Sequence, residues 1–292
     1  MFLQDRASES ADASGGFKLY HYDPTIPGAV IFMLLFLATT AFHFWQLIRP
    51  RCWFMLPLAI GGICKSQPDL PGNHKLILAN STQSPDWTLG PFIMQATLLL
   101  VAPALFAATI YMELGRIIAM VDGEGHVKIP LRWLTKIFVI GDVFSFMLQG
   151  AGAGLQAGGS LEALDNGSKI VVGGLFVQLI CFGVFMVMAV SFDLSIRRAP
   201  TVRSLGGAPW KKHMMALYIG SVFIMVRSVF RAIEYIQGFD GYLLSHEPYM
   251  YVFDSVLMFL VMALFNWRHP AEIMIYLGRS TPNYKMDPVA VV

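Results

Sequence analysis

The chain has 292 residues, of which 55% are hydrophobic and only 14% charged, whereas about a quarter of the residues in a typical soluble protein are charged. The formal net charge of +2 offers no strongly basic surface, so nucleic acid is excluded as the expected partner. Three cysteines, scattered through the sequence, are too few for a disulfide framework or a zinc site. This composition predicts an integral membrane protein.

The first 27 residues are polar and lack the apolar core of a cleavable signal peptide, so residues 1–27 are expected to form an extracellular tail. Seven apolar stretches follow, and most approach the ~20 residues that a membrane-spanning helix needs. They are Gly28–Ile48, Trp53–Ile63, Gly90–Met112, Leu134–Ala157, Ile170–Phe192, Met214–Ile236 and Pro248–Trp267. We therefore predict an all-α integral membrane protein with seven transmembrane helices over residues 28–270, followed by a cytoplasmic C-terminal tail, residues 271–292.

The second stretch is too short for an ordinary span. Its 11 residues, from Trp53 to Ile63, rise only about 16 Å as a helix, roughly half the thickness of the hydrocarbon core. The polar, proline-bearing segment from Lys65 to Lys75 follows where further helix would be needed.

The distribution of basic residues predicts the orientation. Fourteen of the 21 Lys and Arg residues fall in the first, third and fifth connectors, at the adjoining helix ends, and after the last stretch. Five fall on the opposite side, and the other two are Arg227 and Arg231. By the positive-inside rule, the N-terminus is outside and the C-terminus is cytoplasmic.

The sixth stretch contains three charged residues, Arg227, Arg231 and Glu234, whose spacing places them on one face of a helix. A charge at the centre of a bilayer costs about 2.5–3.5 kcal/mol even on the mildest scale, and such residues usually mark functional sites. From their depths we expect Arg231 to contact Asp254, Arg227 to contact Asp142, and Glu234 to bond Arg231 or a loop. The alternative is an ion network that only fixes helix register.

The fourth stretch also contains polar residues, including Asp142 and Gln149 on one stripe. For Gln149, a functional role and a structural role in hydrogen bonding between helices are equally good interpretations, since such bonds contribute about 1 kcal/mol. Gly150, Gly154 and Gly158 in the same region predict close approach of a neighbouring helix. Glu113 and Asp193, near the cytoplasmic ends of other stretches, are expected to be solvated and to pair with loop arginines. Tyr251, one turn before Asp254, is a weaker candidate that could donate a hydrogen bond to that carboxylate.

Several motifs are absent from the sequence. It has no phosphate-binding loop of Walker type, no HExxH motif and no histidine-rich metal box. We therefore expect no cofactor, no metal and no enzymatic activity.

At its polar helices the chain resembles the fungal RTA-like family of seven-span lipid-translocating exporters and aminocholesterol-resistance proteins. The resemblance runs from about Tyr20 over nearly the whole chain and is strongest in the last two stretches. The matching residues are Pro103 to Leu105, Tyr111, Met112, Gly115, Arg116, Asp142 to Ser145, Gln149, Arg227 to Arg231, Glu234, Tyr235, Gly238, Gly241, Glu247, Tyr251, Asp254, His269 and Pro270.

The resemblance implies a protein of the plasma membrane, or of an internal membrane, that handles lipids. Its ligand would be an amphiphile such as a sphingoid long-chain base, and its partners would be membrane lipids, with a homo-oligomer left open. Export, resistance to toxic amphiphiles and porphyrin uptake are all implied activities. The implied ligand network is Asp142, Gln149, Arg227, Arg231, Glu234, Glu247, Tyr251 and Asp254.

In one place the chain departs from the family pattern. Members usually end the second span with a Glu, a Gly-Tyr pair and an Arg, roughly where this chain has Cys64 to Leu76. We interpret residues 65–75 as an artefact of the gene model, either a retained intron or a shifted reading frame. Sequencing the transcript across this junction tests that interpretation.

Three functions remain open at the level of sequence. The first is an amphiphile translocator in which Asp142, Glu234 and Asp254 meet an ammonium group. The second is a receptor-like sensor of lipid or membrane stress, which the number and orientation of the spans would suit. The third is an integral-membrane enzyme using Asp142 or Glu234 as an acid, although no nucleophile or metal constellation supports it.

Overall fold

The computed structural model describes residues 26–49, 52–66, 89–127, 129–156, 161–237 and 251–278, and all regular structure in these ranges is helical. Five helices are long and apolar enough to cross a membrane. They are α2 (Ile26–Ile48), α5 (Leu89–Met120), α6 (Leu131–Gln156), α7 (Leu161–Arg198) and α9 (Trp210–Gln237).

Two shorter apolar segments lie where the sequence predicts the second and seventh spans. The first consists of a 3-10 turn, η1 (Trp53–Met55), and α3 (Leu56–Ser66). The second begins with a turn of π-helix, η3 (Tyr251–Val256), and continues as α11 (Leu257–Trp267). Three small elements complete the described fold: η2 (Glu124–His126), α8 (Val202–Leu205) and α12 (Ala271–Tyr276).

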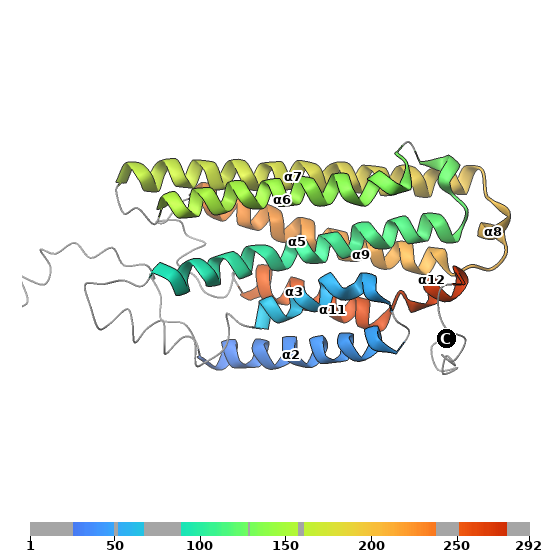
Figure 1. The fold of residues 1–292 in the computed structure, drawn as a ribbon, viewed down its shortest axis with the longest axis horizontal. Coiled ribbons are helices and arrows are strands. Elements are labelled where there is room, and N and C mark those ends of the chain that lie inside the picture. Colours follow the sequence, from blue (N-terminus) through green and yellow to red (C-terminus); the bar gives the residue numbers. More distant parts are fainter. Residues whose placement is uncertain are drawn as a thin grey trace, which may run out of the picture.

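The long helices run side by side along the long axis of the molecule (Figure 1). α6 and α7 pair along their length, α2, α3 and α11 form the opposite side of the bundle, and α5 and α9 pack together between these two groups. α8 and α12 lie at one end, where α12 packs against α5. We call this the basic end, because Arg203 lies on α8 and Arg268 lies between α11 and α12.

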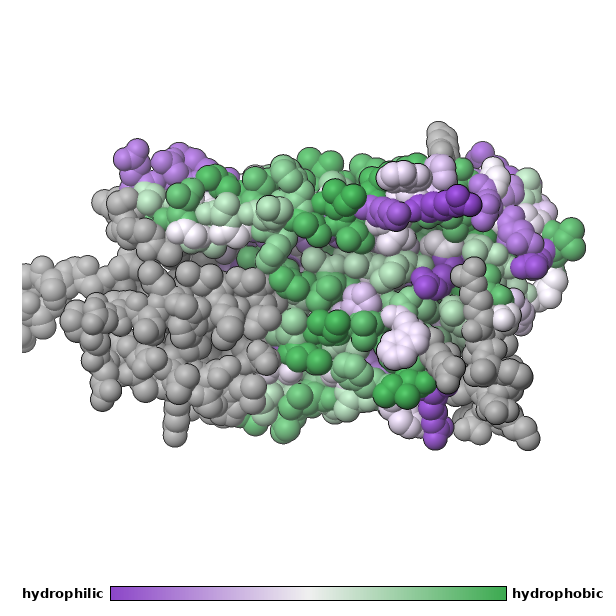
Figure 2. All heavy atoms as spheres, viewed as in Figure 1, coloured by the Kyte–Doolittle hydropathy of each residue, from purple (hydrophilic) through white to green (hydrophobic). Residues whose placement is uncertain are grey.

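Much of the lateral surface is apolar (Figure 2). On α6 and α7, Met147, Ile180 and Val187 leave 65%, 63% and 69% of their surface exposed. Exposing so many large apolar side chains to water would cost about 25 cal/mol per Å². The surface instead suits contact with acyl chains, so the chain is an all-helical integral membrane protein.

The closest approach between α6 and α7 is made by glycines other than those expected. A Cβ added to Gly152 would lie 2.6 Å from the carbonyl oxygen of Gly167, and one added to Gly174 would lie 2.9 Å from that of Ser145. A Cβ atom added to Gly150 or Gly154 would meet nothing within 4 Å, so the expectation that they pack closely was wrong. They lie on the other side of α6, because residues two apart on a helix do not share a face. The third expected position, Gly158, lies outside the described residues.

Candidate functional site

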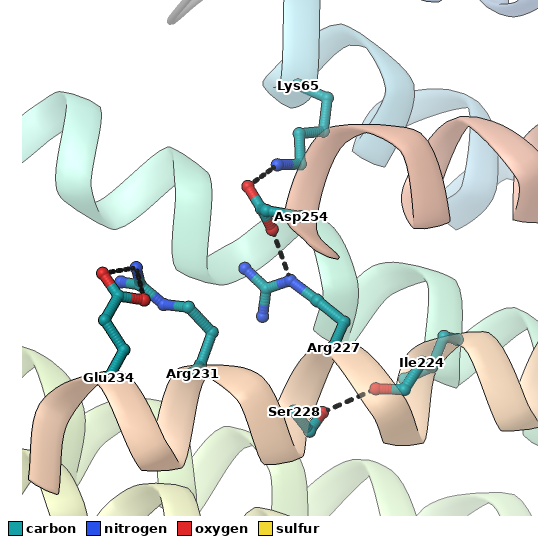
Figure 3. A network of polar contacts seen from close by, with 7 residues as sticks. All are labelled: Lys65, Ile224, Arg227, Ser228, Arg231, Glu234 and Asp254. Carbon is teal, nitrogen blue, oxygen red and sulfur yellow. Dashed lines mark hydrogen bonds and ion pairs between the residues drawn. The ribbon is translucent and has the colours of Figure 1, made fainter. Parts of the chain in front are cut away.

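The predicted polar face of α9 is buried inside the bundle. The exposed fractions of Arg227, Arg231 and Glu234 are only 2%, 8% and 5%. Their spacing of four and then three residues brings them to the same side of α9. All three side chains point toward the neighbouring helices rather than toward lipid (Figure 3).

Asp254 joins two basic side chains from different helices (Figure 3). The Nε atom of Arg227 donates to its Oδ1 atom at 2.6 Å. The ammonium group of Lys65, at the C-terminal end of α3, donates to its Oδ2 atom. All three side chains are at least 94% buried. The carboxylate of Asp254, which lies just before α11, therefore links α3 and α9 to that helix.

The π-helical turn η3 carries this carboxylate. A π-turn inserts an extra residue and locally redirects side chains, and such turns occur often at functional sites. Phe253, next to Asp254, stacks on Phe230 of α9 with ring centroids 4.8 Å apart. This contact fixes η3 against the part of α9 that holds Arg227.

Arg231 and Glu234 form the second ion pair of the network. The Nη1 atom of Arg231 donates to both carboxylate oxygens of Glu234, at 3.0 and 2.8 Å. The expected contact between Glu234 and Arg231 is thus confirmed. The guanidinium group also lies 5.1 Å from the ring centre of Tyr235.

The two pairings expected between helices were wrong. Arg227 pairs with Asp254 rather than Asp142, and Arg231 pairs with Glu234 rather than Asp254. The predicted depths of Asp254 and of the arginines on α9 agree with their contact. Depth along a helix, however, does not show which helices are neighbours. α6, which carries Asp142, packs on α5 and α7, whereas α11 packs on α9.

Lys65 is the residue that sequence reasoning missed. Its place directly after the second apolar stretch predicts a residue of an outer connector, but it lies in the last turn of α3 with 2% of its side chain exposed. A lysine that directly follows an apolar stretch usually lies in water at the end of the helix, so the sequence pattern did not predict that Lys65 is buried. The interpretation of residues 65–75 as a gene-model artefact stays a prediction, and residues 67–75 lie outside the described part of the chain.

Asp142 is buried without a charged partner. It retains 4% of its exposed surface, and neither carboxyl oxygen has a hydrogen-bond partner among the described residues. The hydroxyl of Tyr111 on α5 lies near enough to interact with it, as does the thiol of Cys181 on α7. A buried acid in this state is suited to binding a proton or a cationic group.

Gln149 connects two helices. Its side-chain amide donates to Ser145 at 2.9 Å and to Gln178 of α7 at 3.1 Å, while the Ser145 hydroxyl donates to the carbonyl oxygen of Gly174 at 2.5 Å. These bonds reinforce the glycine contacts between α6 and α7. Of the other candidates, Glu247 lies outside the described residues, as does the side chain of Tyr251.

A second buried polar group lies near the basic end. The ring of His213 on α9 stands between two carboxylates, with Nδ1 3.8 Å from Glu113 and Nε2 3.4 Å from Glu272. Glu113 is fully buried, so the expectation of a solvated residue was wrong. Asp193, also expected to be solvated, is buried with 7% of its surface exposed, so that expectation was wrong too, and it pairs at 2.9 Å with Arg197 of its own helix α7 rather than with a loop arginine.

These features define a class of protein: a polytopic helical membrane protein with a buried ion network. The described residues contain no group of three or more acidic, histidine or cysteine side chains arranged to hold a metal ion. Residues 75–276 match the family model described as RTA1 like protein. The chain belongs to this family.

Three relatives from Saccharomyces cerevisiae place the chain within it. Protein RTA1 is 35% identical over 279 residues, which cover 87% of this chain and 85% of that protein. Protoporphyrin uptake protein 1 is also 35% identical, over 286 residues, 86% of this chain and 91% of the relative. The sphingoid long-chain base transporter RSB1 is 22% identical over 277 residues, 82% of this chain and 69% of the relative. No solved structure matches the chain.

Proposed function

We propose that this protein binds an amphiphile with a cationic headgroup, of the sphingoid-base class, and moves it between the two leaflets of a membrane. The observation that carries this proposal is the buried carboxyl group of Asp142, which forms no ion pair with any described residue and lies beside the hydroxyl group of Tyr111. An ammonium group would supply the charge that the surrounding helices do not.

The other two acids that the sequence analysis proposed as ammonium ligands are already neutralised. Asp254 lies between Lys65 and Arg227, and Glu234 is held by both of its oxygens on Arg231. Removing one partner from such a buried group typically costs about 3–5 kcal/mol, so exchange for a ligand would be unfavourable. Their role in the proposal is to hold α3, α9 and α11 in register beside the path.

The length of the polar face on α9 supports movement across the bilayer. Buried polar residues recur along this helix from His213 through Ser221 and Arg227 to Glu234. His213 and Glu234 are about 32 Å apart at 1.5 Å per residue, close to the ~30 Å of the hydrocarbon core. A headgroup or proton crossing beside α9 would meet polar groups at several depths.

The proposal includes the topology. Seven spans, with the N-terminus outside and the C-terminus cytoplasmic, follow from counting α3 and the η3–α11 segment as spans beside the five long helices. The basic end would then face the cytoplasm, as the positive-inside rule requires. The plasma membrane is the proposed location, and we propose a non-enzymatic role.

The names of the relatives support lipid handling but differ in cargo. One is called a sphingoid long-chain base transporter, and a more similar one is called a protoporphyrin uptake protein. Both cargoes are amphiphiles with a polar headgroup and a large apolar part. We choose the cationic class for this chain because Asp142 is a buried acid that forms no ion pair with any described residue.

A flip assay tests the proposal. Purified protein is reconstituted into phosphatidylcholine vesicles containing a fluorescent sphingoid base, and the fraction of label that an external quencher cannot reach is followed over time. We expect the label to move faster than in empty vesicles. Asp142→Asn should lose most of that acceleration. Glu162→Gln, an acid-to-amide change at an exposed position on α7, is the matched control and should behave as the wild type.

Two results would contradict the proposal. Vesicles with folded wild-type protein that move the label no faster than empty ones would exclude translocation and favour the sensor alternative. A normal rate in Asp142→Asn would show that this carboxyl group does not contact the headgroup.

A further inference from the structure

A groove lies between α9 and α11 at the basic end, away from the ion network. Its volume is about 410 Å³, and its apolar lining includes Met215, Ile219 and Leu264. Met215 and Ile219 remain 62% and 37% exposed on the lateral surface of the bundle. The groove therefore opens where acyl chains would surround the protein.

Three basic residues border the groove: Lys211, Lys212 and Arg268. None of them forms an ion pair with an acid in the ranges that the structure describes. Glu272 interacts electrostatically with Lys212 and Arg268, but its carboxylate is already in contact with His213. The rim of the groove is thus positively charged.

The aromatic residues of the rim are typical of a membrane interface. Trp267 is 75% exposed, and the guanidinium group of Arg268 lies 4.6 Å from the centre of its ring. Tryptophan is enriched at the depth of the lipid headgroups. The cations therefore lie at headgroup level, while the apolar lining extends toward the interior of the bilayer.

We propose that this groove binds an anionic glycerophospholipid, with the phosphate and its acidic headgroup on Lys211, Lys212 and Arg268 and one acyl chain along Met215 and Ile219. Basic pockets between transmembrane helices are known to suit such headgroups, and each Lys or Arg near the surface adds favourable attraction. A zwitterionic lipid has no net charge to match three cations. A soluble phosphate would leave the apolar lining without a partner.

The groove is separate from the ion network of Asp254, Arg227 and Lys65. Lys211 and Arg227 lie 16 residues apart on α9, which corresponds to about 24 Å. Loss of lipid binding here would therefore leave the network of Asp254, Arg227 and Lys65 unchanged. The inference does not depend on which cargo the protein moves.

Competition between two lipids tests the inference. The full-length protein is purified in detergent with equal amounts of dioleoylphosphatidylserine and dioleoylphosphatidylcholine, and retained lipid is counted by native mass spectrometry. The wild type should retain the serine lipid preferentially. The triple variant Lys211→Gln/Lys212→Gln/Arg268→Gln should reduce this preference about tenfold, given three cations partly screened by salt.

A matched control uses the same chemistry elsewhere at the basic end. Arg132→Gln/Lys136→Gln/Arg198→Gln removes three exposed cations outside the groove and should keep the preference. Should the triple groove variant fail to fold, the double variant Lys211→Gln/Arg268→Gln gives the same comparison. Glycerophosphoserine, which has no acyl chains, should not displace the bound lipid.

Three outcomes would overturn the inference. Equal retention of both lipids by the wild type would exclude a selective site. An unchanged preference in the folded groove variant, or an equal loss in the control, would place the selectivity outside the groove. Displacement by glycerophosphoserine at matched concentration would indicate a site for a soluble anion.

Discussion

The ammonium group of Lys65 lies against the carboxylate of Asp254, 189 residues further along the chain. The other oxygen of the same carboxylate accepts from Arg227 at 2.6 Å. Because α3 is only 11 residues long, this contact near its C-terminal end is a principal polar link between α3 and the rest of the bundle. The network thus has a structural role in addition to any role in transport.

Asp254→Asn should destabilise the protein strongly. The change leaves the buried cations of Lys65 and Arg227 without their shared carboxylate, and breaking a buried pair in this way costs about 3–5 kcal/mol. The measurement is thermal unfolding in detergent, followed by tryptophan fluorescence. Asp165→Asn, at an exposed ion pair with Lys169, is the control and should change little. Equal midpoints for the two variants would contradict a structural role for Asp254.

Lys65→Met should cost less than half of that loss. Arg227 still neutralises Asp254 in this variant, and the methionine side chain fills most of the lysine's volume. The same unfolding measurement applies, with Lys169→Met as the exposed control. A loss as large as that of Asp254→Asn would mean that Lys65, rather than Arg227, is the dominant partner.

Two glycines on α6 should respond oppositely to alanine. In Gly152→Ala the new Cβ would lie 2.6 Å from a backbone oxygen of α7, so the helices must separate at a cost of about 1–3 kcal/mol. In Gly150→Ala the methyl group meets nothing within 4 Å, and the stability should stay the same or rise by up to about 1 kcal/mol. Unfolding midpoints in the same detergent compare them. A loss in both variants would contradict the packing of α6 on α7.

His269, which follows α11, should make stability depend on pH. Burial, reinforced by the nearby His213, lowers the pKa of His269 from 6.5 to about 4. Its Nδ1 atom accepts from the backbone N–H of Ala271 at 3.2 Å, which requires that atom to be unprotonated. Between these two pKa values the unfolded chain binds more protons, so stability falls as the pH is lowered from 6.5 toward 4.

The change His269→Asn isolates this contribution, because the asparagine side chain can still accept a hydrogen bond but does not titrate in this range. Unfolding midpoints measured from pH 7.5 to 4.5 should fall less steeply in the variant than in the wild type. The titratable groups that influence His269 are His43, His213 and Glu272, and contact with His213 lowers the pKa of Glu272. Identical slopes in the variant and the wild type would show that the dependence does not come from His269.

The sequence by itself determined the class of protein and the polar face of α9. Apolar stretches of spanning length can be recognised locally, because each helix satisfies its own backbone hydrogen bonds wherever it lies in the bundle. Arg227, Arg231 and Glu234 were predicted to share a buried face, and this depends only on helical periodicity. The bond between Arg231 and Glu234 lies within one helix and could be foreseen for the same reason.

Only the tertiary structure decided which helices are neighbours. Asp142 and Asp254 are both buried acids. The helix α6, which carries Asp142, packs on α5 and α7, whereas η3 and α11 pack on α9, so Asp254 rather than Asp142 neutralises Arg227. The interior position of Lys65 and the burial of Glu113 likewise depend on helices far apart in the sequence. Contacts of this kind are set by side-chain packing between helices, which the period of a single helix does not encode.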